Sequence, residues 1–83
     1  MLSKVEVLNQ GERFCELLID GSMYLVSYAK TVVCVCDGKT YLDEKYHDFS
    51  VTTVRHRNNF LGRGSKEIKA LIEDGTYTLA NLN

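Results

Sequence analysis

The sequence FSVTTVRHRNNFL, residues 49–61, divides the chain into an apolar front part and a short charged back part. Ser50 is a favourable helix N-cap, because its hydroxyl can accept a hydrogen bond from an unpaired amide of the first turn. Gly62 follows the stretch and suits the left-handed conformation that commonly ends a helix. These two signals predict a helix that begins at Val51 and ends before Gly62.

The same stretch also permits a second interpretation. In a helix, Val54, Asn58 and Leu61 lie along one side, at spacings of four and three residues. In a strand, residues 51–54 would be favoured by their four β-branched side chains, Val-Thr-Thr-Val. The cap signals at both ends of the stretch favour the helix over the strand.

The part of the chain before this stretch alternates polar and apolar residues, a pattern that predicts β-strands. The predicted strands are residues 3–9, 13–19, 22–28, 31–36 and 39–42. The run 31–36 is apolar on both faces, which predicts a central strand that is covered on each side. The cover of its second face is either a homodimer partner or the last helix of the same chain.

Short turn sequences separate the predicted strands. Asp20-Gly21 and Asp37-Gly38 are strong signals for two-residue hairpins, because both residue types tolerate the positive φ of a type I′ turn. Asn9-Gln10-Gly11 supplies turn chemistry for the first connection. Residues 43–48 are polar and end the meander.

After residue 61 the sequence predicts a second short helix and a last strand. Ser65 is predicted to cap this helix, and Asp74-Gly75 to end it. Residues 76–80 alternate again and predict a strand that returns to the sheet. The predicted fold is therefore α+β: an antiparallel β-meander of four to six strands, with one or two short C-terminal helices packed on one face.

Size and composition restrict the class of protein. The 83 residues predict a single domain over 1–83, and 45% hydrophobic residues with a net charge of −1 are ordinary for a globular protein. The near-neutral charge argues against a protein that coats nucleic acid generally. No apolar run reaches the roughly 20 residues that span a bilayer, and residues 1–6 lack the apolar core of a signal peptide. We therefore expect a cytoplasmic protein without a membrane partner.

The cysteines and histidines do not form a recognisable metal-binding motif. An odd number of cysteines without an export signal predicts reduced thiols. Cys34 and Cys36 point to the same face of a strand, but a zinc site needs four ligands, and only Cys15 and two histidines remain. Core packing is the favoured role for these thiols. We predict no cofactor, no metal and no enzymatic activity.

Basic residues gather between positions 55 and 69. This basic segment holds Arg55, Arg57, Arg63, Lys66 and Lys69 against the single acid Glu67. Together with helix N-termini, these side chains could contact the phosphates of a nucleic acid in a salt-sensitive manner. The alternative is a solvated helix face without a partner.

Two further groups of side chains are candidates for specific contacts. His56 lies four residues after Thr52 and four before Phe60, so we expect it to bond to Thr52 or a sheet carbonyl and to lock the helix onto the meander. Several tyrosines lie in or beside the meander, where they could form a protein interface, stack on bases or pack against neighbouring strands. These tyrosines are Tyr24, Tyr28, Tyr41 and Tyr46.

One motif resembles a known group of proteins. The residues Phe49-Ser50-x-Thr52-Thr53-x-x-His56-x-Asn58-x-Phe60-Leu61, with Ser27-Tyr28-x-x-Thr31-x-Val33 upstream, are similar to a pattern in small tailed-bacteriophage proteins without an assigned function. The resemblance covers residues 27–61. It implies a phage-type accessory protein that acts in a bacterial host cytoplasm, and it assigns no catalytic residue.

These observations together predict a non-enzymatic protein that binds a host or phage protein and inhibits or modulates a host factor. The alternative is a nucleic-acid-binding protein that uses the basic segment. The candidate binding residues are Tyr24, Tyr28, Arg55, His56, Arg57, Asn58, Arg63 and Lys66.

Overall fold

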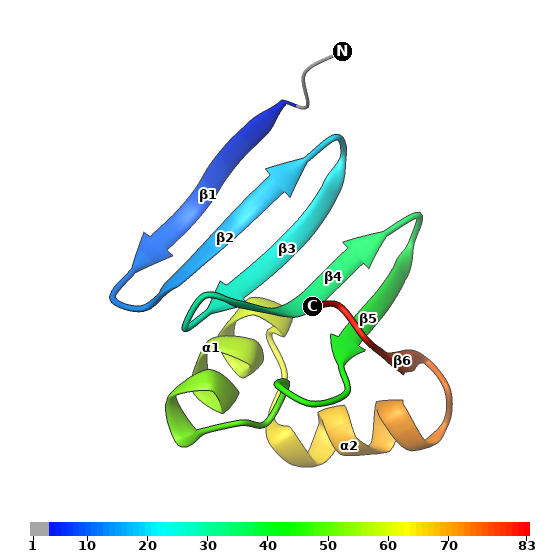
Figure 1. Ribbon diagram of the computed structural model, residues 1–83. Helices are drawn as coiled ribbons and strands as arrows, with labels where there is room; N and C mark the ends of the chain where they lie inside the picture. The colour runs from blue at the N-terminus through cyan, green and yellow to red at the C-terminus, as the bar shows by residue number, and fades with distance from the viewer. Residues whose placement is uncertain (1–3) are drawn as a thin grey trace.

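A computed structural model describes residues 4–83 of the chain as one six-stranded sheet and two helices (Figure 1). The sheet has the strand order β1-β2-β3-β4-β5-β6, and both helices lie between β5 and β6 in the chain. The elements are β1 (Val5–Gly11), β2 (Phe14–Ile19), β3 (Ser22–Ser27), β4 (Lys30–Cys36), β5 (Lys39–Asp43), α1 (Val51–Leu61), α2 (Ser65–Glu73) and β6 (Tyr77–Ala80). The predicted α+β meander is confirmed.

Three of the four meander turns are two-residue turns with positive φ at both positions. Asp20-Gly21 (φ 50° and 85°) and Asp37-Gly38 (φ 51° and 75°) confirm the predicted type I′ hairpins. Tyr28-Ala29 (φ 52° and 62°) forms the third, although neither residue favours this conformation. Tyr28 is therefore a turn residue, and the predicted strand 22–28 ends at Ser27.

The first turn lies later in the chain than predicted. Residues 9–11 belong to β1, where they pair with residues 14–16 of β2, and the chain turns at Glu12-Arg13, with Arg13 at a φ of 68°. Asn9, Gln10 and Gly11 favour a turn by residue type, but their backbone pairing with β2 keeps them in the strand. The predicted strand began at residue 3, which lies outside the described residues, and β1 begins at Val5.

The helix at residues 51–61 is confirmed, and the alternative strand through 51–54 is wrong. The Ser50 hydroxyl accepts a hydrogen bond of 3.1 Å from the Thr53 amide, and Gly62 follows the helix at a φ of 68°. The predicted cap of α2 is wrong, because Gly64 occupies the N-cap position and makes no side-chain bond. The Ser65 hydroxyl instead accepts from the Asn58 amide group, at 3.0 Å.

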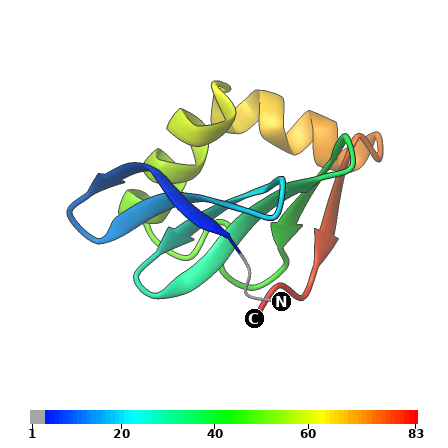
Figure 2. The same cartoon turned by 90° about the horizontal axis from the view of Figure 1, so that it is seen from above.

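Strand β6 returns to the sheet parallel to β5, with Leu79 opposite Leu42. The connection through α1 and α2 places both helices on one side of the sheet (Figure 2). The core forms between them and the sheet, and its buried members are Leu25, Val32, Val33, Leu42, Ile68 and Tyr77. The predicted packing of the helices on one face is thus confirmed, and the last helix does not cover the second face of β4.

Three smaller observations complete the fold. Cys15, Cys34 and Cys36 are free cysteines on strands of the sheet. Within residues 4–83, no group of three or more His, Cys, Asp or Glu side chains is placed to hold a metal ion. No helix in this part of the chain is long and apolar enough to cross a membrane.

Candidate functional site

A cavity of about 160 Å³ opens where the β3–β4 turn meets the loop before α1. Its lining comes from two segments that are distant in the sequence, residues 27–30 and 46–53. We call it the aromatic pocket, and its lining residues are Ser27, Tyr28, Lys30, Tyr46, Phe49 and Thr53. An apolar cavity of about 150 Å³ in another protein holds a benzene molecule, so this volume suits one apolar side chain.

Hydroxyl groups form the floor of the aromatic pocket and join β3 to α1. The Ser27 Oγ atom lies 3.2 Å from Thr53 Oγ1 and 3.0 Å from His56 Nδ1. The Ser50 hydroxyl donates to Thr53 Oγ1 at 3.1 Å. Ser27 and Thr53 are each only 2% exposed. The helix is thus fixed on the sheet by polar contacts that satisfy one another, as buried polar groups require.

His56 locks the helix to the meander through a different sheet atom from the one predicted. Its partner is the side chain of Ser27, and neither Thr52 nor a sheet carbonyl takes that place. The imidazole also packs on the Phe14 ring, with the ring centroids 4.5 Å apart. Burial, and then the charge of Arg55, lower the pKa of His56 below its ordinary value. His56 is therefore a neutral packing residue at pH 7 rather than a cation for phosphate.

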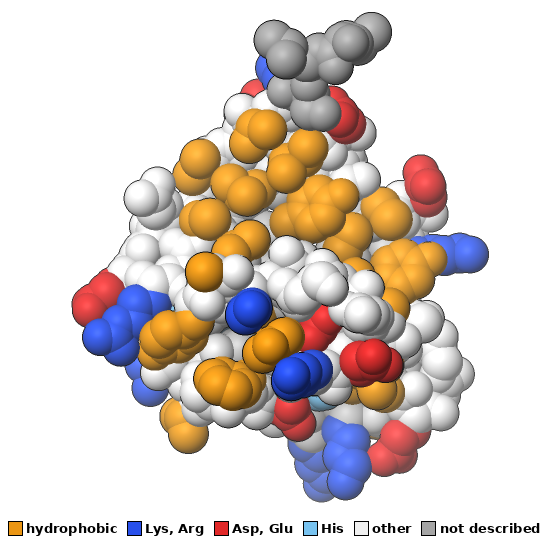
Figure 3. Space-filling view, viewed as in Figure 1, with side chains coloured by type: hydrophobic (Ala, Val, Ile, Leu, Met, Phe, Trp, Pro, Cys, Tyr) orange, Lys and Arg blue, Asp and Glu red, His pale blue; other side chains and the backbone are white. Residues whose placement is uncertain are grey.

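Aromatic rings and Lys30 form the wall of the aromatic pocket, and Lys45 lies beside the Tyr46 ring. The Tyr46 and Phe49 ring centroids are 5.7 Å apart. The Nζ atoms of Lys30 and Lys45 lie 5.2 and 5.4 Å from the Tyr46 centroid, within the range of a cation–π contact. Figure 3 shows hydrophobic and basic surfaces side by side below the sheet. The wall can therefore contact apolar and acidic groups together.

An exposed apolar side chain stands at the rim of the aromatic pocket. Phe49, which lines the pocket, is 66% exposed, and Val51, two residues further along the chain, is 78% exposed. Tyr28 is also exposed, and its hydroxyl accepts a hydrogen bond of 3.3 Å from Arg13. This bond, followed by a second from Thr52, lowers the pKa of Tyr28. A large exposed aromatic side chain beside a cavity is typical of a surface that binds a partner.

Asp43 holds the loop that carries Tyr46. Its buried carboxylate accepts hydrogen bonds from the amides of Lys45 (3.1 Å), Tyr46 (2.8 Å) and Leu82 (2.8 Å). Burial opposes the charge of Asp43, but the bonds from Leu82 and Tyr46, with others, outweigh it and lower the pKa. The loop is thus tied both to the end of β5 and to the chain after β6, which keeps Tyr46 in a fixed place.

Arg57 was predicted to be a binding residue, but its side chain is only 4% exposed and lies in the contact between α1, α2 and the loop. Its guanidinium donates to His47 Nδ1 at 2.8 Å, to Asn58 Oδ1 at 3.1 Å and to Ser65 Oγ at 3.2 Å. Because arginine is always a donor, His47 Nδ1 carries no proton. Arg57 and Asn58 therefore hold the structure together and are not free to bind a phosphate.

The other basic residues are divided between two helices. Arg63 pairs with Glu67 and donates to the Tyr77 hydroxyl at 3.0 Å. Arg55 on α1, and Lys66 and Lys69 on α2, are exposed. Of the five cations of the predicted basic segment, Arg57 is buried and Arg63, although exposed, is paired within the fold. Arg55, Lys66 and Lys69 are the three exposed cations that remain for a contact with phosphate.

The two candidate tyrosines also lie apart. Tyr28 lines the aromatic pocket, whereas Tyr24 lies on the sheet face that the helices leave open. The sequence indicated Tyr46 only as one of four tyrosines that could form an interface, and it assigned neither Lys30 nor Lys45 to a site. The signal that was present is the pair of segments around Ser27-Tyr28 and Phe49-Ser50, which the fold brings together at the pocket.

Comparison with known proteins gives one match. The sequence model of a family described as "Family of unknown function (DUF8033)" matches residues 3–75. Neither a curated protein nor a solved structure matches the chain.

Proposed function

The chain belongs to a family of unknown function (DUF8033), and we propose that it is a non-enzymatic protein-binding module whose binding site is the aromatic pocket. The observation that supports this most strongly is the exposed Phe49 ring beside a preformed cavity of about 160 Å³. An aromatic residue is costly to leave in water, and interfaces are enriched in such residues. The pocket receives one apolar side chain of the partner, which acts as its anchor.

The charges around the pocket define the rest of the partner segment. Lys30 and Lys45 flank Tyr46, and Arg13 lies 5.6 Å from the centre of the Tyr28 ring. These cations favour acidic residues next to the anchor, since complementary charges speed association and select among partners. The proposed ligand is therefore a protein segment with one apolar anchor and acidic neighbours.

The floor of the pocket supports a binding role over a catalytic one. Ser27 and His56 are 3.0 Å apart, a distance that a nucleophile and its base would also have. The Ser27 hydroxyl, however, is 2% exposed and is shared with Thr53. A hydroxyl that is held in this way by a helix and hidden from solvent serves to fix α1 on β3.

The partner is proposed to be a protein of a bacterial cell. The resemblance of residues 27–61 to small tailed-phage proteins is the reason for this choice, and it makes inhibition or modulation of a host factor the proposed effect. The protein would act in the host cytoplasm. Four residues belong both to that resemblance and to the pocket lining, namely Ser27, Tyr28, Phe49 and Thr53.

The test is capture of a partner from bacterial extract, followed by measurement of the affinity with purified proteins. Because Phe49 is exposed, Phe49→Ala should leave the fold intact while it weakens binding at least tenfold, as loss of an anchor contact does. Leu79→Ala is the matched control, because Leu79 is an exposed apolar residue of β6 outside the pocket. Equal affinity of both variants and the wild type would contradict the proposal.

Nucleic-acid binding through the basic segment is the competing function, and the same preparation tests it. A short oligonucleotide should bind at low salt and dissociate as salt increases if Arg55, Lys66 and Lys69 contact phosphates. Arg55→Glu combined with Lys66→Glu should then abolish binding. Absence of binding at low salt would leave the protein partner as the object of the search.

A further inference from the structure

One face of the sheet has no cover from the helices. The register places Val7, Leu17, Tyr24, Cys34, Tyr41 and Thr78 opposite one another, in a single row that crosses the sheet from β1 to β6. Directly paired residues point to the same side of a sheet. The alternate row contains Leu25, Val33 and Leu42, which are fully buried in the core with Ile68 of α2. The first row therefore lies on the face away from the helices, which we call the open face.

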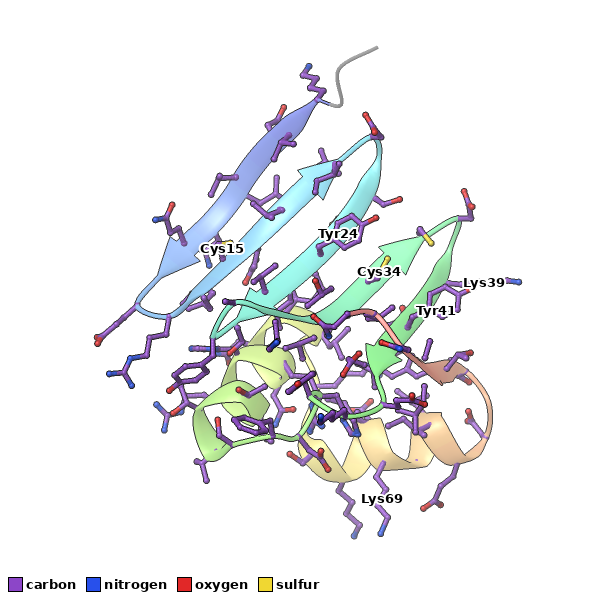
Figure 4. All side chains as sticks on the ribbon, viewed as in Figure 1. Cys15, Tyr24, Cys34, Lys39, Tyr41 and Lys69 are labelled. Carbon is purple, nitrogen blue, oxygen red and sulfur yellow. The ribbon has the colours of Figure 1, made fainter. Side chains whose placement is uncertain are left out.

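The open face is apolar and carries its charges at the margin. The rows beside the central one hold Val5, paired with Ile19, and Cys15, paired with Val26. Figure 3 shows a continuous hydrophobic surface over the sheet, with charged side chains around it. In Figure 4, Tyr24, Cys34 and Tyr41 lie side by side on this face, and Lys39 points away at its edge. A surface of this kind gains free energy when water leaves it.

We propose that the open face is the interface of a homodimer, in which the sheets of two copies pack face to face. A two-fold axis brings the same surface of both copies together, and a surface without internal charge meets its own copy without repulsion. Sheets stack in this manner at about 10 Å when their facing side chains are apolar. A charged partner would find no complementary group in the central row.

The area is sufficient for such a contact. With about 4.8 Å between strands and about 3.3 Å per residue, β1–β5 present a projected area of about 480 Å². The accessible area of a face with tyrosine and leucine side chains exceeds its projection, so each copy is near the roughly 600 Å² at the lower end of stable interfaces. Tyr24 and Tyr41, on either side of the small Cys34, supply the largest contacts.

The exposure of strand β1 also supports a homodimer that buries the open face. All seven residues of β1 are exposed. Val5 and Val7 lie on the open face, and each is 56% exposed although its side chain is apolar. The strand pairs only with β2 and receives no helix above it. A chain of 83 residues forms only a small hydrophobic core. Apolar side chains of an edge strand that stay in water therefore favour burial against another surface. A second copy stacked on the open face provides it.

The mass of the full chain in solution tests the proposal by light scattering. The wild type should have twice the monomer mass of 9.4 kDa. Val7→Lys combined with Leu17→Lys should give the monomer mass with unchanged circular dichroism, because a charge in the central row cannot be buried against its own copy. Val51→Lys is the matched control, since Val51 is equally apolar and 78% exposed but lies on α1, and it should remain dimeric. A wild-type monomer at high concentration would overturn the proposal.

Thiol reactivity gives a second readout that does not need a folded variant. Cys15 and Cys36 are free, half-buried and on strands of the sheet, and Cys15 lies on the open face. In a dimer, dilution should accelerate their modification by a soluble thiol reagent, because the dissociated face becomes accessible. A rate that does not change with protein concentration would contradict the dimer. No residue of the central row lines the aromatic pocket, so this test is independent of the proposed function.

Discussion

At the scale of single residues, Arg57 shows how a cation can be structural. Its donors reach His47, Asn58 and Ser65, so a lysine, which has one ammonium group, cannot replace the planar fork. We expect Arg57→Lys to lower the free energy of unfolding by about 2 kcal/mol. Urea denaturation measures this change. Arg55→Lys, on the exposed side of the same helix, should leave the denaturation midpoint where it is.

The two histidines predict how stability depends on pH. Burial lowers the pKa of both His47 and His56 in the folded protein. The unfolded chain therefore binds more protons once the pH falls below the ordinary histidine value of about 6.5. Stability should be constant above this pH and should decrease as the pH falls through the window between 6.5 and the folded values. The lowered pKa of Asp43 adds a further loss at more acidic pH.

Urea denaturation between about pH 7.5 and about pH 5.5 checks this dependence. The variant His47→Gln with His56→Asn retains polar side chains that do not titrate, so its stability should change less across the same range. A wild-type protein that became more stable at the acidic end would show that the histidines are charged in the fold. That result would also remove the argument that His56 acts as a neutral packing residue.

The contacts of single residues were the least predictable part of the site. Ser27 is separated from Thr53 by 26 positions and from His56 by 29, and nothing local in the sequence indicates such a partner. Arg57 belonged to a run of cations that suggested a surface, and only the packing of α1, α2 and the loop shows that it is buried. Burial of a charge depends on tertiary partners, which periodicity does not reveal.

At the scale of elements, Gly62 determines where α1 ends. Its φ of 68° lies in the left-handed region, where a Cβ atom is unfavourable, although no atom lies near the position of that Cβ. We expect Gly62→Ala to lower the free energy of unfolding by roughly 1 kcal/mol through backbone strain alone. The measurement is again chemical denaturation.

Gly64 offers the matched comparison. It has the same open surroundings but a φ of −82°, which any residue adopts. Gly64→Ala adds no left-handed strain and should therefore cost less than Gly62→Ala, about 0.5 kcal/mol, because alanine is a poorer N-cap than glycine. Equal losses in the two variants would mean that general flexibility of the link between the helices, and not the left-handed cap, sets the effect.

Elements marked by strong local chemistry were predictable, and those without it were not. The Asp-Gly turns and the Ser50 and Gly62 caps specify their own backbone conformations, and all of them lie where expected. The Tyr28-Ala29 turn has no such residues, so its positive φ values are imposed by the pairing of β3 with β4. Ser65 has cap chemistry, but its hydroxyl is used by Arg57 and Asn58 instead.

At the scale of the whole molecule, the apolar run of β4 was recognisable from sequence, but its cover was not. Residues 31–36 indicated a strand with two apolar faces, and the position of the helices decides which face is left open. The parallel return of β6 beside β5 puts both helices on the same side (Figure 2). Topology of this kind follows from contacts over the whole chain, so the open face became visible only in the assembled fold.

The same open face links stability to protein concentration. If two copies bury it, unfolding also separates them, and dilution favours the unfolded chains by mass action. A tenfold change in concentration corresponds to about 1.4 kcal/mol per dimer, which should shift the melting temperature by about 3–6 °C. Scanning calorimetry of the wild type at several concentrations measures this shift.

The variant Val7→Lys with Leu17→Lys is the control for this measurement. It should melt at a lower temperature that no longer depends on protein concentration, because the variant is already a monomer. A wild-type melting temperature that stays constant over a hundredfold dilution would show that one copy is stable with its open face in water, and the face would then have to be explained by a different partner.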